Sequence, residues 1–122
     1  MKNSQTPPQN LAKEDFRVLI TYPNLTLMLV PSLAIGIFTR ILKKQKYQVG
    51  LFDTTHYVAD ENSSPQNRVK FLQAREFNET NDLGVRIRTE LIGDYVEKIE
   101  SFKPHLIIYS VVEDCYRQTL AL

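Results

Sequence analysis

Three short apolar runs, separated by two segments with helical periodicity, constrain most strongly what this chain can fold into. The runs cover Phe16–Thr21, Tyr47–Asp53 and His105–Ser110, and the third continues through Val111 and Val112. Their β-branched and aromatic residues are typical of strands, and a run that is apolar on both faces is typical of a buried parallel strand. The sequence therefore predicts an α/β fold in which helices connect parallel strands.

The two intervening segments have the periodicity of amphipathic helices. Between Ser32 and Lys46, apolar residues recur at i, i+4 and i+8 in two adjacent rows. These rows are Leu33, Ile37 and Ile41 beside Ala34, Phe38 and Leu42. The segment Thr89–Phe102 has a similar face, made by Leu91, Ile92, Tyr95, Val96, Ile99 and Phe102, and Pro104 ends it. We therefore expect one helix in each connection.

Right-handed crossovers on the two sides of the first strand predict an open parallel sheet with strand order 2-1-3. After the third strand only Cys115–Leu122 remain, which is enough for the start of one helix. We therefore expect an incomplete sheet, as in the N-terminal part of a longer polypeptide. Its third strand would lack a neighbour and would offer an edge through which a homo-oligomer can form.

The chain is predicted to be one domain at residues 16–122, preceded by a loose polar tail at residues 1–15. A polar insert at residues 54–88 is long for a single connection, which suggests binding, an interface or mobility. Within the insert, Arg68–Phe77 has the weak pattern of a short helix.

Composition narrows the class of partner and the compartment. With 15 basic and 14 acidic residues, the formal charge of +1 gives no electrostatic footprint for nucleic acid. Val18–Thr39 carries no charge, but Pro23, Asn24 and Pro31 interrupt it, so we expect a strand, loop and helix and no membrane segment. A single cysteine and a polar start without a signal peptide favour a soluble, cytoplasmic protein.

Ligands of open α/β sheets lie outside the carboxyl ends of the strands, where the strand order reverses. For order 2-1-3, this crevice opens between the first and third strands. The candidate binding residues at its rim are Tyr22, Pro23, Asn24, Leu25, Thr26, Ser110, Val111, Val112 and Glu113. Asp53, Thr54 and Asp114 complete the rim.

The rim's composition limits what it can hold. The loop Tyr22–Ser32 contains no glycine, which argues against a dinucleotide or a nucleoside triphosphate. It offers no acid for the magnesium ion of a receiver domain. The apolar stretch Leu25–Val30 instead favours a broad, flat, largely uncharged ligand or a protein partner.

Single polar residues support no catalytic assignment and no metal site. His56 lies near Asp53, Asp60 and Glu61, but such a group is usually a solvated loop, so we assign no metal to it. Cys115 is interpreted as a buried thiol. His105 falls at the amino end of its strand, away from the crevice, and is interpreted as a packing or surface residue. Ser110, at a central strand end, is the best polar candidate for a ligand contact.

Two stretches of the sequence resemble a known family. The first is VLITYPNLTLMLVPSLAIGIFTRILKKQKYQVGLFDTTHY and the second is KPHLIIYSVVED. Together with the helix through Phe102, they resemble the N-terminal cobalamin-binding domain of radical SAM enzymes, over Phe16–Asp114. The shared features are an apolar loop ending in Pro-Ser, a helix ending in a basic segment before a strand closed by Asp, and a Lys-Pro-x-Leu-Ile strand ending in Ser.

The resemblance implies a flavodoxin-like, Rossmann-like sheet of five strands, of which three are present here. It implies that the loop after the first strand grips the nucleotide tail of cobalamin and that the domain supports the lower face of the corrin. Tyr22–Leu27 has no counterpart of the Asp-x-His-x-x-Gly motif, so a bound cobalamin would lack a histidine lower ligand from this loop. The later glycine pair of the family lies beyond Leu122.

The family's catalytic part is a separate barrel that binds S-adenosylmethionine and a [4Fe-4S] cluster through a Cys-x-x-x-Cys-x-x-Cys motif. Cys115 is the only cysteine here, so these residues cannot assemble that cluster. The expected function is a cobalamin-binding module that is not catalytic alone and that acts with the rest of a parent polypeptide. The alternative is a truncated or degenerate α/β module that serves in protein association without a cofactor.

Overall fold

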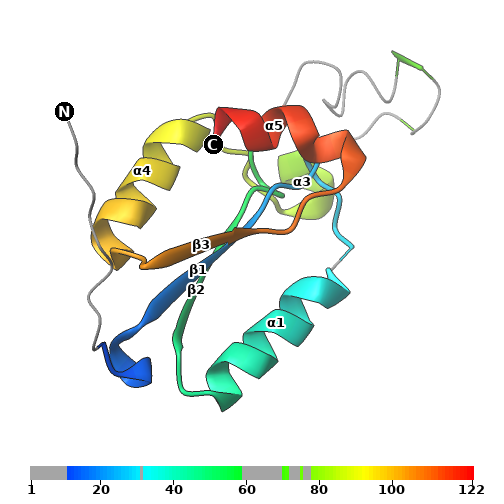
Figure 1. The fold of residues 1–122 in the computed structure, drawn as a ribbon. Coiled ribbons are helices and arrows are strands. Elements are labelled where there is room, and N and C mark those ends of the chain that lie inside the picture. The colour runs from blue at the N-terminus through cyan, green and yellow to red at the C-terminus, as the bar shows by residue number, and fades with distance from the viewer. Residues whose placement is uncertain (1–10, 31, 59–69, 72–74, 76–77) are drawn as a thin grey trace.

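The computed structural model describes residues 11–30, 32–58, 70–71, 75 and 78–122. Its strands are β1 (Arg17–Tyr22), β2 (Gln48–Asp53) and β3 (Leu106–Tyr109), and its helices are α1 (Leu33–Lys44), α3 (Glu79–Leu83), α4 (Leu91–Phe102) and α5 (Tyr116–Ala121). Short 3₁₀ turns, η1 (Lys13–Asp15) and η3 (Glu113–Cys115), precede β1 and α5. Figure 1 shows this order of elements.

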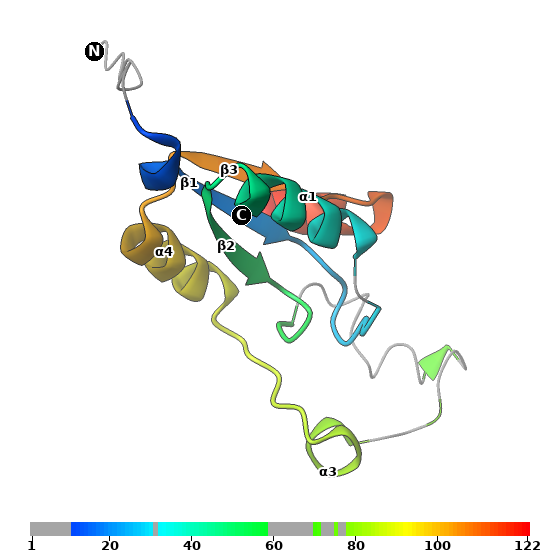
Figure 2. The ribbon, with the colours of Figure 1, turned by 90° about the horizontal axis from the view of Figure 1, so that it is seen from below.

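Within the described residues, the sheet has three parallel strands in the order β2-β1-β3, which confirms the predicted α/β open sheet and its strand order. β1 lies between the other two strands (Figure 2). Four consecutive residues of β1, Val18–Thr21, are at most 1% exposed. The central strand is thus buried on both faces, as its apolar composition predicts.

The helices cover both faces of the sheet. α1 lies on one face, and α4 and α5 lie on the other (Figure 1). The Ser32 hydroxyl caps α1 by accepting the Ile35 N–H at 3.5 Å, and Lys43 and Lys44 occupy the last turn, where cations stabilise the helix dipole.

α1 packs on the sheet less closely than its sequence suggests. No residue of α1 is fully buried, and Leu33, Ile37 and Ile41 are 78%, 49% and 54% exposed. The sheet-facing side instead has the half-buried Ala34 and Leu42. One of the two predicted apolar rows therefore remains largely in solvent.

α4 contributes Leu91 and Tyr95 to the hydrophobic core. Tyr95 is 2% exposed and packs with Leu19 and Phe52, and its ring centroid lies 4.8 Å from that of Phe52. Close packing of α4 on β2 depends on Gly50, because a Cβ built there would lie 3.1 Å from the Phe102 ring. Gly50 thus makes room in β2 for an aromatic ring of α4.

A chain of hydroxyl groups links the central strand to the edge strand under α4. The Tyr95 hydroxyl lies 3.1 Å from the Thr21 hydroxyl and 2.8 Å from the Tyr109 hydroxyl. Burial and the hydrogen bond with Tyr95 raise the pKa of Tyr109 to about 12. The neutral phenol of Tyr109 is therefore favoured in the folded state.

This raised pKa gives a pH dependence of stability. Because the folded-state pKa of Tyr109 exceeds the usual value of 10.0, its stabilising effect is present below pH 10 and is lost as the pH rises towards 12. We expect the urea midpoint to fall over this window, and to fall less steeply in Tyr109→Phe. Equal slopes in the two proteins would show that Tyr109 does not titrate in this way.

The insert between β2 and α4 is only partly described. It contains α3, which the sequence did not predict and which stands apart from the sheet (Figure 2). Most of the predicted short helix at Arg68–Phe77 lies outside the described residues. Tyr57 and Arg88 form an isolated parallel bridge, so the two ends of the insert meet.

The described helices are all too short or too polar to cross a membrane.

The end of the N-terminal segment, which the sequence predicts to be a loose tail, has some local order. Lys13–Asp15 forms η1, and the Gln48 side chain donates a hydrogen bond to the Glu14 carbonyl at 2.7 Å.

Candidate functional site

The three loops that follow the strands meet at the carboxyl edge of the sheet, where the sequence predicts the site. Asn24, in the loop after β1, is 4% exposed. Its side-chain amide donates to the Met28 carbonyl at 2.7 Å and to the Thr55 hydroxyl at 2.8 Å. Its backbone N–H donates to the Thr54 hydroxyl at 2.7 Å. Asn24 thus joins the β1 loop to the turn after β2.

Thr54 connects all three loops. It is fully buried, and its hydroxyl donates to the Asn24 carbonyl at 3.0 Å. The same oxygen accepts the Asn24 N–H and the side-chain amide of Gln118 in α5, the latter at 3.0 Å. One hydroxyl group therefore ties the β1 loop and α5 to the end of β2.

These bonds also fix the orientation of Gln118. A hydroxyl has a single proton, and that of Thr54 is donated to Asn24, so Gln118 must face Thr54 with its nitrogen. Gln118 is 8% exposed, and its Oε1 is a buried acceptor with no hydrogen-bond donor in the described part of the chain.

Two further contacts hold the β1 loop against β2. The hydroxyl of Thr26, which is 1% exposed, donates to the Tyr57 carbonyl at 2.7 Å. The Leu27 N–H donates to the Thr55 carbonyl at 2.8 Å, and Leu27 has a φ of 58°, in the left-handed region that residues other than glycine seldom adopt. Asp53 stabilises the turn by accepting the Thr55 N–H at 2.9 Å.

Cys115 links the β1 loop to the segment after β3. The thiol is 1% exposed and forms no disulfide. Burial raises the pKa of Cys115, as does the nearby Asp114, while a hydrogen bond from the Leu25 backbone opposes this shift. The burial of this thiol agrees with the interpretation of Cys115 as a buried thiol.

Burial also raises the pKa of Tyr22, with contributions from Asp53 and Cys115.

The predicted site residues divide into a buried floor and an exposed rim. Pro23, Asn24 and Thr26 are buried, and the polar groups of Asn24 and Thr26 bond within the protein. Tyr22 and Leu25 are half-buried. Ser110 is half-buried, and its backbone N–H donates to the Thr21 carbonyl at 3.1 Å.

The rim has apolar side chains from two loops. Leu29 and Val30 follow β1 and are 58% and 66% exposed, and Val111 and Val112 follow β3 and are 40% and 60% exposed. Glu113 is exposed beside them. We call the four apolar side chains the apolar rim.

Two cavities lie on the β2 side of this edge, and Ser110–Glu113 line neither of them. The smaller, of about 440 Å³, lies between the β1 loop, the start of α1 and the end of β2. The larger, of about 800 Å³, lies between β2, residues 84–88 and α4. Leu51, Asp53 and His56 line both cavities.

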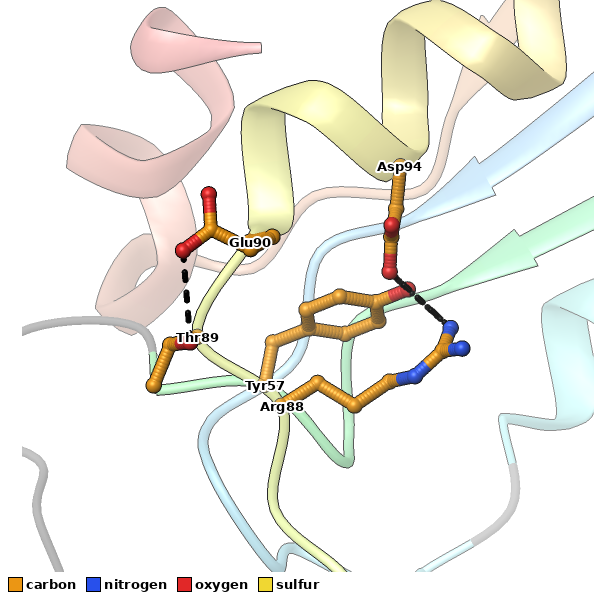
Figure 3. Close-up of polar contacts among 5 residues, drawn as sticks. All are labelled: Tyr57, Arg88, Thr89, Glu90 and Asp94. Atoms are coloured by element: carbon orange, nitrogen blue, oxygen red, sulfur yellow. Dashed lines mark hydrogen bonds and ion pairs between the residues drawn. The ribbon is translucent and has the colours of Figure 1, made fainter.

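A polar cluster beside the larger cavity was not predicted from the sequence. Asp94 of α4 accepts a hydrogen bond from the Tyr57 hydroxyl at 2.8 Å and forms an ion pair with Arg88 at 3.0 Å (Figure 3). Arg88 also donates to the Tyr57 hydroxyl at 2.9 Å. Burial and Asp94 raise the pKa of Tyr57, and Arg88 opposes this shift. These contacts hold both ends of the insert, at Tyr57 and Arg88, against Asp94 of α4.

The histidines have different surroundings. His56 is exposed at the junction of the two cavities, and no three His, Cys, Asp or Glu side chains of the described residues are grouped as metal ligands. Asp60 and Glu61 lie outside the described residues. His105 accepts the Arg17 N–H at 2.9 Å and packs on Phe16 at the amino end of the sheet, as expected for a packing residue.

The fold and this edge define an open, parallel α/β sheet with a polar floor and an apolar rim at the carboxyl ends of its strands. No family model, no curated protein and no solved structure matches the chain significantly.

Proposed function

We propose that this chain is a cobalamin-binding module that is not catalytic alone and gives cobalt no histidine lower ligand. The observation that supports this most strongly is the apolar rim, formed by Leu29, Val30, Val111 and Val112 at the end of a 2-1-3 sheet. A corrin is a broad, flat macrocycle, and burying such a face against exposed apolar side chains is favourable.

The chemistry of the rim agrees with this ligand. The hydroxyls of Thr26 and Thr54 and the amide of Asn24 bond within the protein, so the floor is rigid and offers few free polar groups. Polar recognition would come from Ser110, whose hydroxyl bonds to no other described residue, and from Glu113. Both groups suit the amide side chains at the edge of a corrin.

The sequence resemblance supports a parent polypeptide whose radical chemistry uses S-adenosylmethionine and an iron-sulfur cluster. Because Cys115 is the only cysteine here, cluster ligands would have to come from another part of such a polypeptide. This chain's contribution would be to bind cobalamin and to exclude water from its lower face.

The proposal predicts that the purified protein retains corrin absorbance after mixing with hydroxocobalamin and desalting. Val112→Glu should weaken binding by about 10-fold or more, because it places a charge under an apolar ligand face. Leu120→Glu is the matched control, since Leu120 is 70% exposed on α5, outside the apolar rim, and this variant should bind as the wild type does.

Replacement of His56 or His105 by alanine should leave the visible spectrum of the bound cobalamin unchanged. A shift in the His56 variant would show that the protein does supply a lower ligand. Absence of retained absorbance in the wild-type chain would contradict the proposal and favour the alternative, an association module without a cofactor.

A further inference from the structure

The charges of this chain are distributed unevenly between the two ends of the sheet. Three segments meet at the amino end, namely residues 11–17 before β1, residues 43–48 at the end of α1 and residues 103–105 after α4 (Figure 1). They contain six basic and two acidic residues, a local formal charge of +4, whereas the formal charge of the whole chain is +1. The rest of the sequence is therefore acidic on balance.

Side-chain contacts join these three segments into one surface. Lys46, after α1, forms an ion pair with Glu14 of η1 at 3.8 Å. The Arg17 side chain, at the start of β1, donates to the Lys103 carbonyl at 2.7 Å. We define the basic amino-end surface by its five exposed lysines, which are Lys13, Lys43, Lys44, Lys46 and Lys103.

Aromatic rings lie among these lysines. The centroid of the Phe16 ring lies 5.7 Å from that of Tyr47 and 5.1 Å from that of His105. The Lys13 ammonium lies 6.0 Å from the centre of the Tyr47 ring. Phe16 and Tyr47 are half-buried, and His105 is exposed. Cations beside aromatic rings are the combination that binds single-stranded nucleic acid, because the cations contact phosphates and the rings stack on bases.

Helix dipoles account for only part of this surface. Lys43 and Lys44 occupy the last turn of α1, where a cation is favourable, but Lys13 lies in η1. Lys46 and Lys103 have φ angles of 66° and 49°, in the left-handed region that glycine adopts more easily. Each therefore has a conformational cost that glycine would avoid, which points to a use for the charged side chain.

Few carboxylates oppose the lysines at this end. Glu14 is paired with Lys46, and Asp15 is exposed beside it in η1. One helical turn further along α1 and α4, Arg40 and Glu100 add one charge of each sign. The surface therefore keeps a net positive charge when its neighbours are included.

We propose that the basic amino-end surface binds a single-stranded nucleic acid. Its lysines contact backbone phosphates as point charges, and the exposed ring of His105 offers a face for stacking with a base. A total charge of +1 indicates no footprint for nucleic acid, but the fold separates the charges that cancel in this total. The apolar rim lies at the opposite end of the sheet, so the inference is independent of cobalamin binding.

Fluorescence anisotropy with a labelled single-stranded oligothymidylate tests the proposal. We expect binding at low salt, with a slope of about −3.5 when the logarithm of the association constant is plotted against that of the salt concentration. This slope corresponds to roughly five phosphate contacts at about −0.7 each. A polyglutamate chain of the same charge should bind at least about 5-fold more weakly, because it offers no bases for stacking.

Lys43→Gln combined with Lys103→Gln should weaken binding by about 10-fold at low salt and make the slope less negative by about 1.4, because two phosphate contacts are lost. Arg86→Gln combined with Arg117→Gln is the matched control. It removes the same charge from two exposed residues outside the surface, and its affinity should stay within about 2-fold of the wild type.

A second pair, Lys13→Gln with Lys44→Gln, should cause a similar loss of affinity from other positions of the surface. Circular dichroism identifies whether each variant is folded, and the two pairs guard against the failure of one to fold. Absence of oligothymidylate binding, or equal affinities of both lysine pairs and the wild type, would overturn the proposal. Equal weakening by the arginine pair would also overturn it, and equally tight binding of polyglutamate would indicate an acidic polypeptide as the partner instead.

Discussion

Thr54→Val should lower the free energy of unfolding by about 3–5 kcal/mol, although valine has nearly the same shape as threonine. The substitution leaves three buried groups without their partner: the Asn24 N–H, the Asn24 carbonyl and the side-chain amide of Gln118. An unsatisfied buried polar group costs about 1–3 kcal/mol. Urea unfolding measures the loss as a lower midpoint with an unchanged slope.

Two controls separate the hydroxyl from its surroundings. Thr54→Ser keeps the hydroxyl and should cost only about 1 kcal/mol for the lost methyl group. Thr39→Val makes the same chemical change at a half-buried position of α1 whose hydroxyl bonds to no other described residue, and should change stability by less than about 0.5 kcal/mol. A similar small effect of Thr54→Val would show that this hydroxyl does not hold the loops together.

Tyr95→Ala should lower the free energy of unfolding by about 4 kcal/mol, because it leaves a cavity beneath α4. Tyr95 is 2% exposed and packs in the core cluster with Leu19 and Phe52. Loss of its ring removes the packing of Tyr95 against Leu19 of β1 and Phe52 of β2.

Tyr95→Phe separates the ring from its hydroxyl. This variant keeps the packing and should cost about 1–2 kcal/mol, since it deprives the fully buried Thr21 hydroxyl of the Tyr95 hydroxyl. Thermal and urea unfolding of the two variants measure both contributions. If Tyr95→Phe were as destabilising as Tyr95→Ala, the hydroxyl chain rather than the core would hold α4 in place.

The strands and their order were predictable because the signals are local. The β-rich runs that became β1 and β3 identify strands by composition, and right-handed crossovers on the two sides of the first strand give the order 2-1-3. The burial of each helix was less predictable. Ile37 and Ile92 belong to apolar helical faces in the sequence, yet both remain exposed, because burial depends on which neighbours cover each flank.

The candidate site was predictable in position but not in bonding. Asn24 and Thr26 do lie at the carboxyl edge, as the 2-1-3 topology requires. Their partners Thr54, Thr55 and Tyr57 are about thirty residues away, and nothing in residue type indicates these pairings. The cluster of Tyr57 with Arg88 and Asp94 was missed for the same reason, because the two ends of a long polar insert meet only in the fold.

The Thr54 hydroxyl has a consequence for motion at the carboxyl edge. Because the β1 loop and α5 both bond to the same buried oxygen, neither can move away from the sheet without disturbing an atom that the other also uses. Local opening of these segments is therefore cooperative. A molecule that binds to the β1 loop would therefore also restrain α5, and the reverse also holds.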